Sequence, residues 1–585
     1  MAQEGSSPVS LGSPPSKPKA CVNCRRRKIK CDGERPKCGP CSRSMGFQDC
    51  EYAEDGPTRT QVLQEQISIL QARIEELETP NLARPVVPLQ NPYSGVRRST
   101  SLPASTAGST ANLNPNIFSG GISEDAVGTH LDETLIQTFL KHSYQFGFFL
   151  NMRNFNDTVL RSTSTSSPGN IPRPTRFLLA VIDLWAVHLH SSPDDYIRAS
   201  EGVYLSRALR ASVDALAGVS LHHTLIHAIQ AEVLLSHYFL RNLRFLEGKY
   251  HISSAVSLVL SSGLHRLRSA DAFNLALMLP FRRLAQPGLP PPRDMVEENE
   301  RINAFWAVLT LNNGWTAVDG SPSNFYSYTG GHGEGDVAAR IDTPWPVDID
   351  DDEPAYLKSS MGTVTSFLAG LPDNGTSITA MKVKAMILFE QASRLAAQYR
   401  EDMLAEQSHQ FYNSFNALDA LIEQFKISMT ISHSSSFSSA HSTHDSRRSR
   451  DLFVIHSLVN VATIQLHNPL VFSSRNMGES SRVRVLGAAR SIADDIAARA
   501  SDIAIGEFGF IDPIVGTLLF ATAQVFIAEL RRSRANRAMN GPIPQEEHEL
   551  VGLIESVMGV MNVFAPTCRL MESQLITLQQ LFHGL

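Results

Sequence analysis

The chain has 585 residues, and its charge is unevenly distributed along the sequence. Residues 1–50 carry ten basic and four acidic residues, a net charge of +6, whereas the rest carries forty-two basic and fifty-four acidic residues, a net charge of −12. Only the N-terminal part is therefore suited to binding nucleic acid. No membrane span is predicted, because the apolar stretch Ile514–Ala528 is short and contains Gly, Thr and Gln.

Six of the seven cysteines lie between Cys21 and Cys50, with the spacing C-x2-C-x6-C-x6-C-x2-C-x8-C. Thiolates hold Zn²⁺ tetrahedrally, and closely paired cysteines are typical of structural zinc sites. Six sulfurs complete two four-ligand sites only if two of them bridge both metals, so the pattern predicts a small binuclear zinc cluster. A secreted disulfide framework is disfavoured, because no signal peptide is recognised and Cys568 is the one cysteine elsewhere.

Basic residues are concentrated in the same segment as the cysteines. Metal binding at Cys24 and Cys31 would fix the positions of the cations between them, and a rigid basic surface of this size suits a phosphate backbone. The alternatives are an ordinary solvated surface and a nuclear-import signal, and import is compatible with DNA binding as a second use. The basic residues concerned are Arg25, Arg26, Arg27, Lys28, Lys30, Arg35, Lys37 and Arg43.

Residues 19–52 resemble the fungal binuclear zinc-cluster transcription factors. The resemblance rests on the cysteine spacing, the basic stretch after Cys24, Lys30-Cys31-Asp32 and Arg35-Pro36-Lys37-Cys38. It implies two zinc ions per chain, a nuclear location and binding to double-stranded DNA. The sulfurs of Cys21 and Cys38 would bridge the metals, and the remaining ligands would each bind one metal: Cys24, Cys31, Cys41 and Cys50.

The same resemblance implies roles for the cations. Lys28 matches the lysine that reaches base edges of a CGG triplet in the major groove, and Arg27 would assist through its main-chain carbonyl or a phosphate contact. Pro36 matches a loop proline that is often in the cis form. The remaining cations would position the module on the DNA backbone without specifying sequence: Arg25, Arg26, Lys30, Arg35 and Lys37.

Residues 61–79 predict a short dimerising coiled coil, joined to the cluster by a linker at residues 53–60. Its apolar residues recur in steps of four and three, with isoleucine at a and leucine at d, which favours a parallel two-stranded coil and hence a homodimer. The alternative is a single amphipathic helix packed on its own domain. The predicted seam consists of Leu63, Ile67, Leu70, Ile74 and Leu77.

The remaining boundaries follow from composition and periodicity. Residues 1–18 are expected to be a disordered leader and residues 80–130 a disordered linker. From residue 131 to 585, helical periodicity predicts a large all-α regulatory domain, interrupted by an exposed Ser-rich loop at residues 431–450. Helices are predicted at Leu135–Phe149, Leu225–Leu246, His251–Leu264, Glu300–Leu311, Ile378–Tyr399, Leu452–Leu466, Arg484–Ala500, Val515–Leu530 and Glu547–Val563.

The helical part resembles the middle homology region of the same family more loosely. The resemblance is carried by residues 255–266, by Glu300-Arg301 with Phe305-Trp306, and by the proline-containing stretch Ile341–Pro346, whereas Asn312 and Ser321 depart from the pattern. It implies a regulatory role, with a coactivator or a small-molecule effector as a possible partner. The alternative hypothesis is a metabolite sensor or an enzyme in which the zinc cluster is a targeting device. A helical pocket with convergent polar groups of perturbed pKa would favour the enzyme, and an apolar pocket without them would favour ligand sensing.

Overall fold

The computed structural model describes residues 20–43, 50, 52, 133–160, 174–189, 195–217, 222–269, 289–325, 340–348, 362–434, 443–471, 478–500, 503, 509–537 and 544–584. The contacts divide the chain into two units on either side of the Gly120–Gly121 bond. The predicted leader (1–18), coiled coil (61–79) and linker (80–130) lie outside the described residues.

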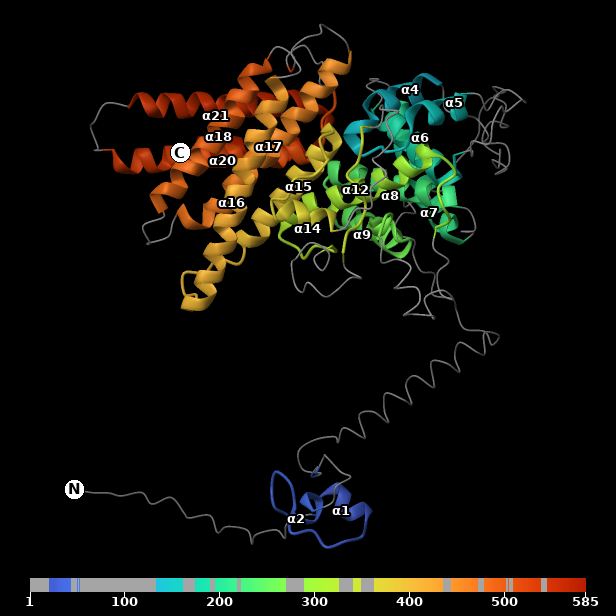
Figure 1. Cartoon of the computed structure of the whole chain (residues 1–585), viewed down its shortest axis with the longest axis vertical. Helices are drawn as coiled ribbons and strands as arrows, with labels where there is room; N and C mark the ends of the chain where they lie inside the picture. The colour runs from blue at the N-terminus through green and yellow to red at the C-terminus, as the bar shows by residue number, and fades with distance from the viewer. Residues whose placement is uncertain are drawn as a thin grey trace, which may run out of the picture. The chain divides into compact units, whose positions relative to one another are not determined.

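The second unit is built from helices, and no β-strand occurs among the residues described (Figure 1). This agrees with the all-α fold predicted from periodicity. In chain order the elements are α4 (Glu133–His142), η3 (Ser143–Phe146), α5 (Met152–Leu160), α6 (Arg176–Leu189), α7 (Asp195–Ala217), α8 (His222–Arg241), α9 (Phe245–Ser261), η5 (Leu264–Arg266), α12 (Met295–Asp319), α14 (Thr363–Leu368), α15 (Ile378–Ala396), α16 (Ala405–Ser434), α17 (Thr443–Val471), α18 (Gly478–Ala498), α20 (Ile514–Asn536), α21 (Gln545–Phe564), η7 (Ala565–Thr567) and α22 (Arg569–His583).

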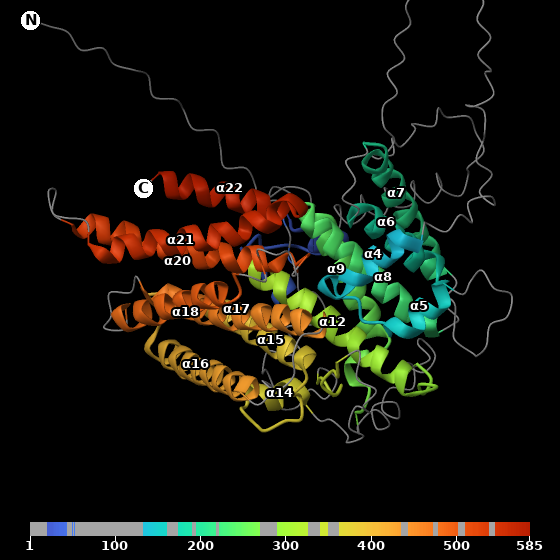
Figure 2. The same cartoon turned by 90° about the horizontal axis from the view of Figure 1, so that it is seen from above.

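Helix α12 lies between two groups of helices (Figure 2). It packs on α8 and α9 on one side and on α15 and α20 on the other. Its residues Phe305, Trp306 and Leu309 are buried in one hydrophobic core that includes residues from both groups. Burial of this much apolar surface from two directions makes α12 the central helix of the body.

Among the described residues, two helices are long and apolar enough to cross a membrane by length and composition alone, α20 and the stretch Gln545–Thr567. Both pack against other helices of the body: α20 on α17, α18, α21 and α22, and α21 on α18, α20 and α22. Apolar helices buried in this way are ordinary core elements of a helical body.

The predicted boundary within Leu225–Leu246 is wrong. Instead of one helix, α8 ends at Arg241 and α9 begins at Phe245. The turn places Leu243 at φ +62°, and the Asn242 side chain donates a hydrogen bond to the Tyr238 carbonyl at 2.8 Å. An asparagine that bonds to nearby backbone competes with the helix, which explains the break.

The predicted exposed loop at 431–450 is also wrong in part, since α16 continues to Ser434 and α17 begins at Thr443. Arg450 is buried, and the Arg447 guanidinium lies 3.3 Å from the centre of the Tyr144 ring. Cationic and aromatic side chains therefore tie the first turns of α17 to the α4–η3 region, which polarity alone did not predict.

The stretch Ile341–Pro346, predicted to be an acidic, proline-containing loop, is anchored on the body. Asp342 is fully buried, and its carboxylate accepts hydrogen bonds from Arg340 Nε at 2.8 Å, Ser269 Oγ at 2.7 Å and the Gly362 amide at 2.6 Å. The Trp345 ring stacks on that of Trp306 with centroids 4.8 Å apart. A buried carboxylate with several donors fixes a segment that has no regular structure of its own.

The positions at which the sequence departs from the family pattern form a different network. The Asn312 side chain donates to Ser323 Oγ at 2.9 Å and accepts from Asn324 Nδ2 at 3.0 Å. Helix α12 then ends at Gly320, whose φ of +70° suits a glycine C-cap. Neutral hydrogen bonds thus hold the turn at the positions where this sequence departs from the family pattern.

Candidate metal centre and nucleic-acid interface

The first unit contains two short helices that begin in the same way, α1 (Val22–Arg26) and α2 (Gly39–Ser42) (Figure 1). Cys21 is the N-cap of α1, and Cys38 is the N-cap of α2, with φ/ψ of −60°/156° and −67°/152° respectively. Each pair C-x2-C thus places one sulfur at the cap and the next on the first turn. Because the two pairs are placed equivalently, their four sulfurs lie close together: Cys21, Cys24, Cys38 and Cys41.

Four sulfurs converge at distances that suit a tetrahedral metal. The Sγ atoms of Cys21 and Cys38 are 3.7 Å apart, those of Cys24 and Cys38 are 3.6 Å apart, and those of Cys24 and Cys41 are 3.9 Å apart. Zinc–sulfur bonds of about 2.3 Å at tetrahedral angles place ligand sulfurs about 3.8 Å from one another. The sulfurs of all four cysteines are buried and fit the donor set that Zn²⁺ prefers.

Cys31 and Cys50 complete the cluster from its edge. Cys31 has its sulfur within 4.8 Å of that of Cys38, and the Cys38 amide donates to Cys50 Sγ at 3.4 Å. Cys38 therefore adjoins both outer cysteines in addition to Cys21, Cys24 and Cys41. All six predicted ligand cysteines come together, with Cys38 near the centre.

The protein environment acts differently on the inner and outer cysteines, because hydrogen bonds lower the pKa of the Cys31 and Cys50 thiols. Burial raises the pKa of the Cys24, Cys38 and Cys41 thiols above the usual range. A bound Zn²⁺ reverses this effect, because a metal-coordinated thiol is deprotonated. The thiols of these three buried cysteines therefore depend on bound metal to take the ligand form, as expected where metal binding supplies the folding free energy.

Tyr52, which the sequence analysis did not single out, closes one side of the cluster. Its hydroxyl donates to the Glu34 carbonyl at 2.8 Å and lies 4.0 Å from Cys31 Sγ. The Arg35 guanidinium lies 4.8 Å from the centre of the Tyr52 ring. The sequence could have identified Tyr52 from its position two residues after Cys50, the last cysteine. A buried aromatic side chain so close to a metal ligand must pack on the cluster.

The predicted DNA contacts fall mainly on the end of α1. Arg25, Arg26, Arg27, Lys28 and Lys30 are all exposed. Asp32, which follows the basic run in the sequence, instead bonds within the module. Its Oδ2 accepts a hydrogen bond from the Gly39 amide at 2.9 Å. The Arg35–Pro36 bond is cis, as expected from the resemblance.

Lys28 has a backbone conformation that glycine usually occupies. Its φ is +54°, and among the described residues it shares a positive φ with one other non-glycine residue, Leu243. The Lys28 amide donates to the Arg25 carbonyl at 3.2 Å, and the Ile29 amide donates to the Cys24 carbonyl at 3.1 Å. This pair of bonds is a Schellman motif, in which the left-handed residue follows the C-cap. It ends α1 abruptly and holds Lys28 at a fixed point beside the exposed end of the helix.

Comparison with known proteins identifies the first unit. Residues 19–59 match the fungal Zn(2)-Cys(6) binuclear cluster domain. Transcription factor opdR of Penicillium oxalicum is 46% identical over 57 residues, which are 9% of this chain and 7% of that protein. The citrinin biosynthesis transcriptional activator mrl3 of Monascus ruber is 24% identical over 339 residues, which are 51% of this chain and 60% of that protein.

A second such activator, ctnR of Monascus purpureus, is 24% identical over 339 residues, covering 51% of this chain and 53% of that protein. These relatives are thus matched over at most 60% of their length. A match to half of this chain is longer than its first 130 residues and so includes part of the helical body. No solved structure matches the chain. Residues 19–59 are therefore a fungal Zn(2)-Cys(6) binuclear cluster domain, which binds two zinc ions, in a chain whose relatives are fungal transcription factors.

Proposed function

We propose that this chain is a sequence-specific transcription factor that acts in the nucleus and recognises CGG half-sites in double-stranded DNA as a homodimer. The observation that carries the proposal is the end of α1, where a Schellman motif holds exposed Lys28 between exposed arginines and Lys30. A rigid, densely charged turn on a small metal-held module suits insertion into a major groove lined by phosphates.

In this proposal the metals share two sulfurs. Cys21 and Cys38 would bridge the zinc ions, and each of the other four cysteines would bind one ion. Support comes from the equivalent positions of Cys21 and Cys38 at the two helix N-caps, and from the place of Cys38 beside the other sulfurs. Outer ligands Cys24, Cys31, Cys41 and Cys50 then complete the two sites.

The DNA contacts divide into base recognition and positioning. Lys28 donates to the guanine O6 and N7 acceptors of the CGG triplet, which are displayed in the major groove. The Arg27 carbonyl, at the C-cap of α1, is proposed to accept from a cytosine amino group. Phosphate contacts come from the surrounding cations, which fix orientation without specifying sequence: Arg25, Arg26, Lys30, Arg35 and Lys37.

Dimerisation is proposed for residues 61–79, with residues 53–60 setting the separation of the two clusters. The seam has Leu63, Leu70 and Leu77 at d and Ile67 and Ile74 at a. Two tethered clusters gain affinity through effective concentration, which explains how a reader of three bases becomes selective. The helical body, residues 131–585, is proposed to regulate this DNA-bound dimer.

The decisive experiment is a selection of randomised DNA duplexes by the full-length chain, with zinc measured in parallel. Paired CGG triplets at a fixed spacing and two zinc ions per chain are expected. Cys38→Ser should lose zinc and all DNA selection, whereas Cys568→Ala, a buried cysteine outside the cluster, should keep both. Full DNA binding by zinc-free Cys38→Ser protein would contradict the metal proposal.

The dimer is tested separately. Ile67→Asp with Leu70→Asp should lower affinity for two-half-site DNA while retaining binding to a single CGG, because charges at a and d prevent the seam from packing. Ser68→Asp with Ala72→Asp places the same charge on the opposite face of the predicted helix and should leave the dimer intact. An undiminished dimer in sedimentation of the first variant would place the interface elsewhere.

An enzyme in the helical body is the second candidate, and one pocket there, lined mostly by apolar side chains, favours ligand binding instead. Its charged side chains are engaged with one another, with Lys382 Nζ 3.4 Å from Asp512 Oδ2 and Arg447 Nε 3.9 Å from Asp451 Oδ2. His237 in the same pocket has its Nδ1 atom without a hydrogen-bond partner. Among the described residues, no hydroxyl of this pocket is therefore hydrogen-bonded to His237 Nδ1, and nucleophilic catalysis uses a hydroxyl bonded to such a base.

A further inference from the structure

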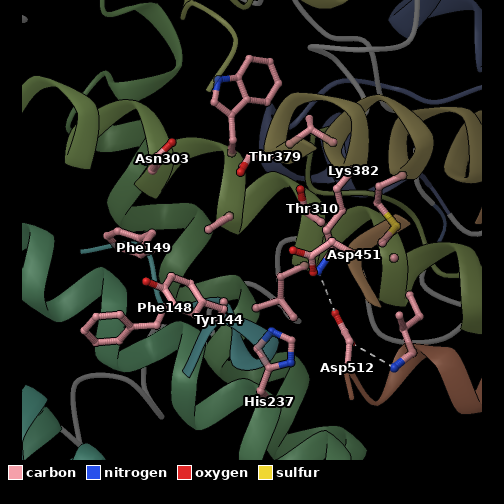
Figure 3. A pocket seen from close by; sticks show the side chains of 18 of the residues that line it. Tyr144, Phe148, Phe149, His237, Asn303, Thr310, Thr379, Lys382, Asp451 and Asp512 are labelled. Carbon is pink, nitrogen blue, oxygen red and sulfur yellow. Dashed lines mark hydrogen bonds and ion pairs between the residues drawn. The ribbon is translucent and has the colours of Figure 1, made fainter. Parts of the chain in front are cut away.

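A partly enclosed pocket opens in the helical body between α8, α12, α15 and α17 (Figure 3). It comprises about 920 Å³ of space between atoms, including its opening to solvent. Most of its wall is aromatic or aliphatic, including Phe148, Phe149, Trp306, Trp315, Val383 and Met386. Apolar walls with a few polar groups are the usual lining of small-molecule sites.

The charged side chains at the pocket form pairs of opposite charge, so the pocket has no net charge that a ligand could neutralise. Lys382 pairs with Asp512, whose other oxygen accepts from the Ile514 amide at 3.1 Å, so this pair is fixed to the start of α20. Arg447 faces Asp451 and covers the Tyr144 ring. Figure 3 shows Lys382, Asp451 and Asp512 together on one side of the space. A charged ligand would have to separate one of these pairs in a largely desolvated site, which is unfavourable.

Two buried polar atoms at the pocket lack the partner that burial normally demands. Asn303 and His237 are each 5% exposed, and both line the pocket. Asn303 Oδ1 and His237 Nδ1 have no hydrogen-bond partner among the described residues. Leaving such a group unsatisfied destabilises the fold, so a structure that retains two in one apolar pocket needs an explanation.

The two unpartnered atoms define what a ligand must offer. A carbonyl oxygen such as Asn303 Oδ1 only accepts, so its partner carries an O–H or N–H group. Burial lowers the pKa of His237 to about 4, so its imidazole is neutral at physiological pH and does not attract an anion. The Trp306 and Trp315 rings on the wall favour a flat apolar body.

We propose that this pocket binds an uncharged, largely apolar ring compound that carries a hydroxyl or amide hydrogen-bond donor directed at Asn303. The site lies wholly within the helical body and goes beyond the proposed reading of DNA, on which it does not depend. A ligand there would contact α12 and α15 together, and these helices belong to the centre of the body.

The test is isothermal titration calorimetry of the full-length, zinc-loaded chain with three matched probes. 1-Naphthol is uncharged and carries a donor, 1-methoxynaphthalene has the same rings without a donor, and 1-naphthoate is charged. The proposal expects 1-naphthol to bind at least about tenfold more tightly than 1-methoxynaphthalene, the effect of one buried hydrogen bond with an otherwise unsatisfied acceptor. It also expects 1-naphthoate to bind more weakly than 1-naphthol.

Variants locate the effect. Asn303→Leu should reduce the preference for 1-naphthol to within about twofold without lowering thermal stability, because it removes an unsatisfied acceptor. Ala307→Leu, which extends a side chain into the space, should abolish binding of 1-naphthol while the helical circular dichroism persists. The matched control is Ser457→Ala, which should bind as the wild type does. Ser457 is a buried residue of α17 outside the pocket, and its hydroxyl also has no hydrogen-bond partner among the described residues.

Each contrary result is decisive. Equal affinity for 1-naphthol and 1-methoxynaphthalene would show non-specific apolar binding and overturn the proposal, as would no binding at all. Unchanged affinity in a folded Ala307→Leu variant would place the bound probe elsewhere. Selection of CGG sites by the wild-type chain is a separate measurement, so a failure here is distinguishable from a failure of the DNA-binding proposal.

Discussion

Lys28→Gly should stabilise the zinc module and at the same time weaken its binding to CGG-containing DNA. Lys28 occupies the left-handed position of a Schellman motif at φ +54°, where glycine is the favoured residue. At most surface positions that contact DNA, removing the side chain does not stabilise the folded protein. Lys28 is different, because its backbone conformation is strained by the same side chain that is proposed to read the bases.

The expected magnitude follows from two opposing effects on folding. Left-handed backbone costs an L-residue roughly 1–2 kcal/mol, and glycine removes that strain. Glycine also adds about 0.5–1 kcal/mol of backbone entropy to the unfolded chain. Lys28→Gly should therefore stabilise the zinc-bound module by about 0.5–1 kcal/mol, whereas Lys28→Ala retains the strain and should leave stability nearly unchanged.

The effect on DNA should be large and the same for both substitutions. Loss of a base contact costs roughly 1–3 kcal/mol and relaxes preference at that base, which corresponds to about 5- to 150-fold in affinity for the specific site. Binding to DNA without CGG should change much less, because the phosphate contacts remain.

The assay combines zinc retention with DNA binding in the full-length chain. Competition with a chromogenic chelator reports module stability, since zinc binding and folding are coupled. Lys30→Gly is the matched control: Lys30 is exposed and is not among the residues with positive φ, so glycine there should weaken zinc retention and lower affinity for all sequences. Retained CGG preference in Lys28→Gly would refute the proposed role of Lys28. Poorer zinc retention in Lys28→Gly than in Lys28→Ala would refute the strain argument.

Three further predictions concern pH and metal. Burial raises the pKa of Glu300 to about 7 from 4.5, so the contribution of Glu300 to stability is complete below pH 4.5 and is lost as pH rises through 7. Glu300→Gln should therefore remove up to about 3 kcal/mol of the pH dependence of the unfolding free energy, measured by chemical denaturation. A variant with the same pH profile as the wild type would contradict this prediction. The pKa of Asp342 is lowered from 3.8, because hydrogen bonds from Arg340, the Gly362 amide and Ser269 outweigh the effect of burial. The contribution of Asp342 to stability is therefore present above pH 3.8 and is lost as pH falls further. Asp342→Asn should destabilise the body by roughly 1–3 kcal/mol at neutral pH, and an unchanged melting temperature would count against this hydrogen-bond network. Zinc removal by a chelator should abolish DNA binding while the thermal transition of the helical body stays in place, and a joint loss of both would show that the two units fold together.

Some features of the protein were predictable because their cause is local. Six cysteines in a fixed spacing leave few ways to satisfy a metal, so the cluster could be predicted without its coordinates. Amphipathic periodicity likewise predicted α15, α20 and α21, each of which has a polar face and a buried face. Helix α6 was not predicted, because it is buried on nearly every side and its sequence has no polar stripe to reveal the period.

The tertiary structure decided what depends on contacts between distant residues. Tyr52 and the left-handed turn at Lys28 are set by the packing and hydrogen bonds of the folded cluster. The residues from 443 to 450 are helical where polarity suggested a loop, because Arg447 meets Tyr144 some three hundred positions away in the sequence. The pocket between α8, α12, α15 and α17 has the same origin. Asn303 Oδ1 and His237 Nδ1, which have no hydrogen-bond partner among the described residues, become significant only when burial removes water from both. Sequence spacing thus determined the metal chemistry, whereas hydrogen bonds within the folded module decided the conformation of Lys28 and long-range burial decided the character of the pocket.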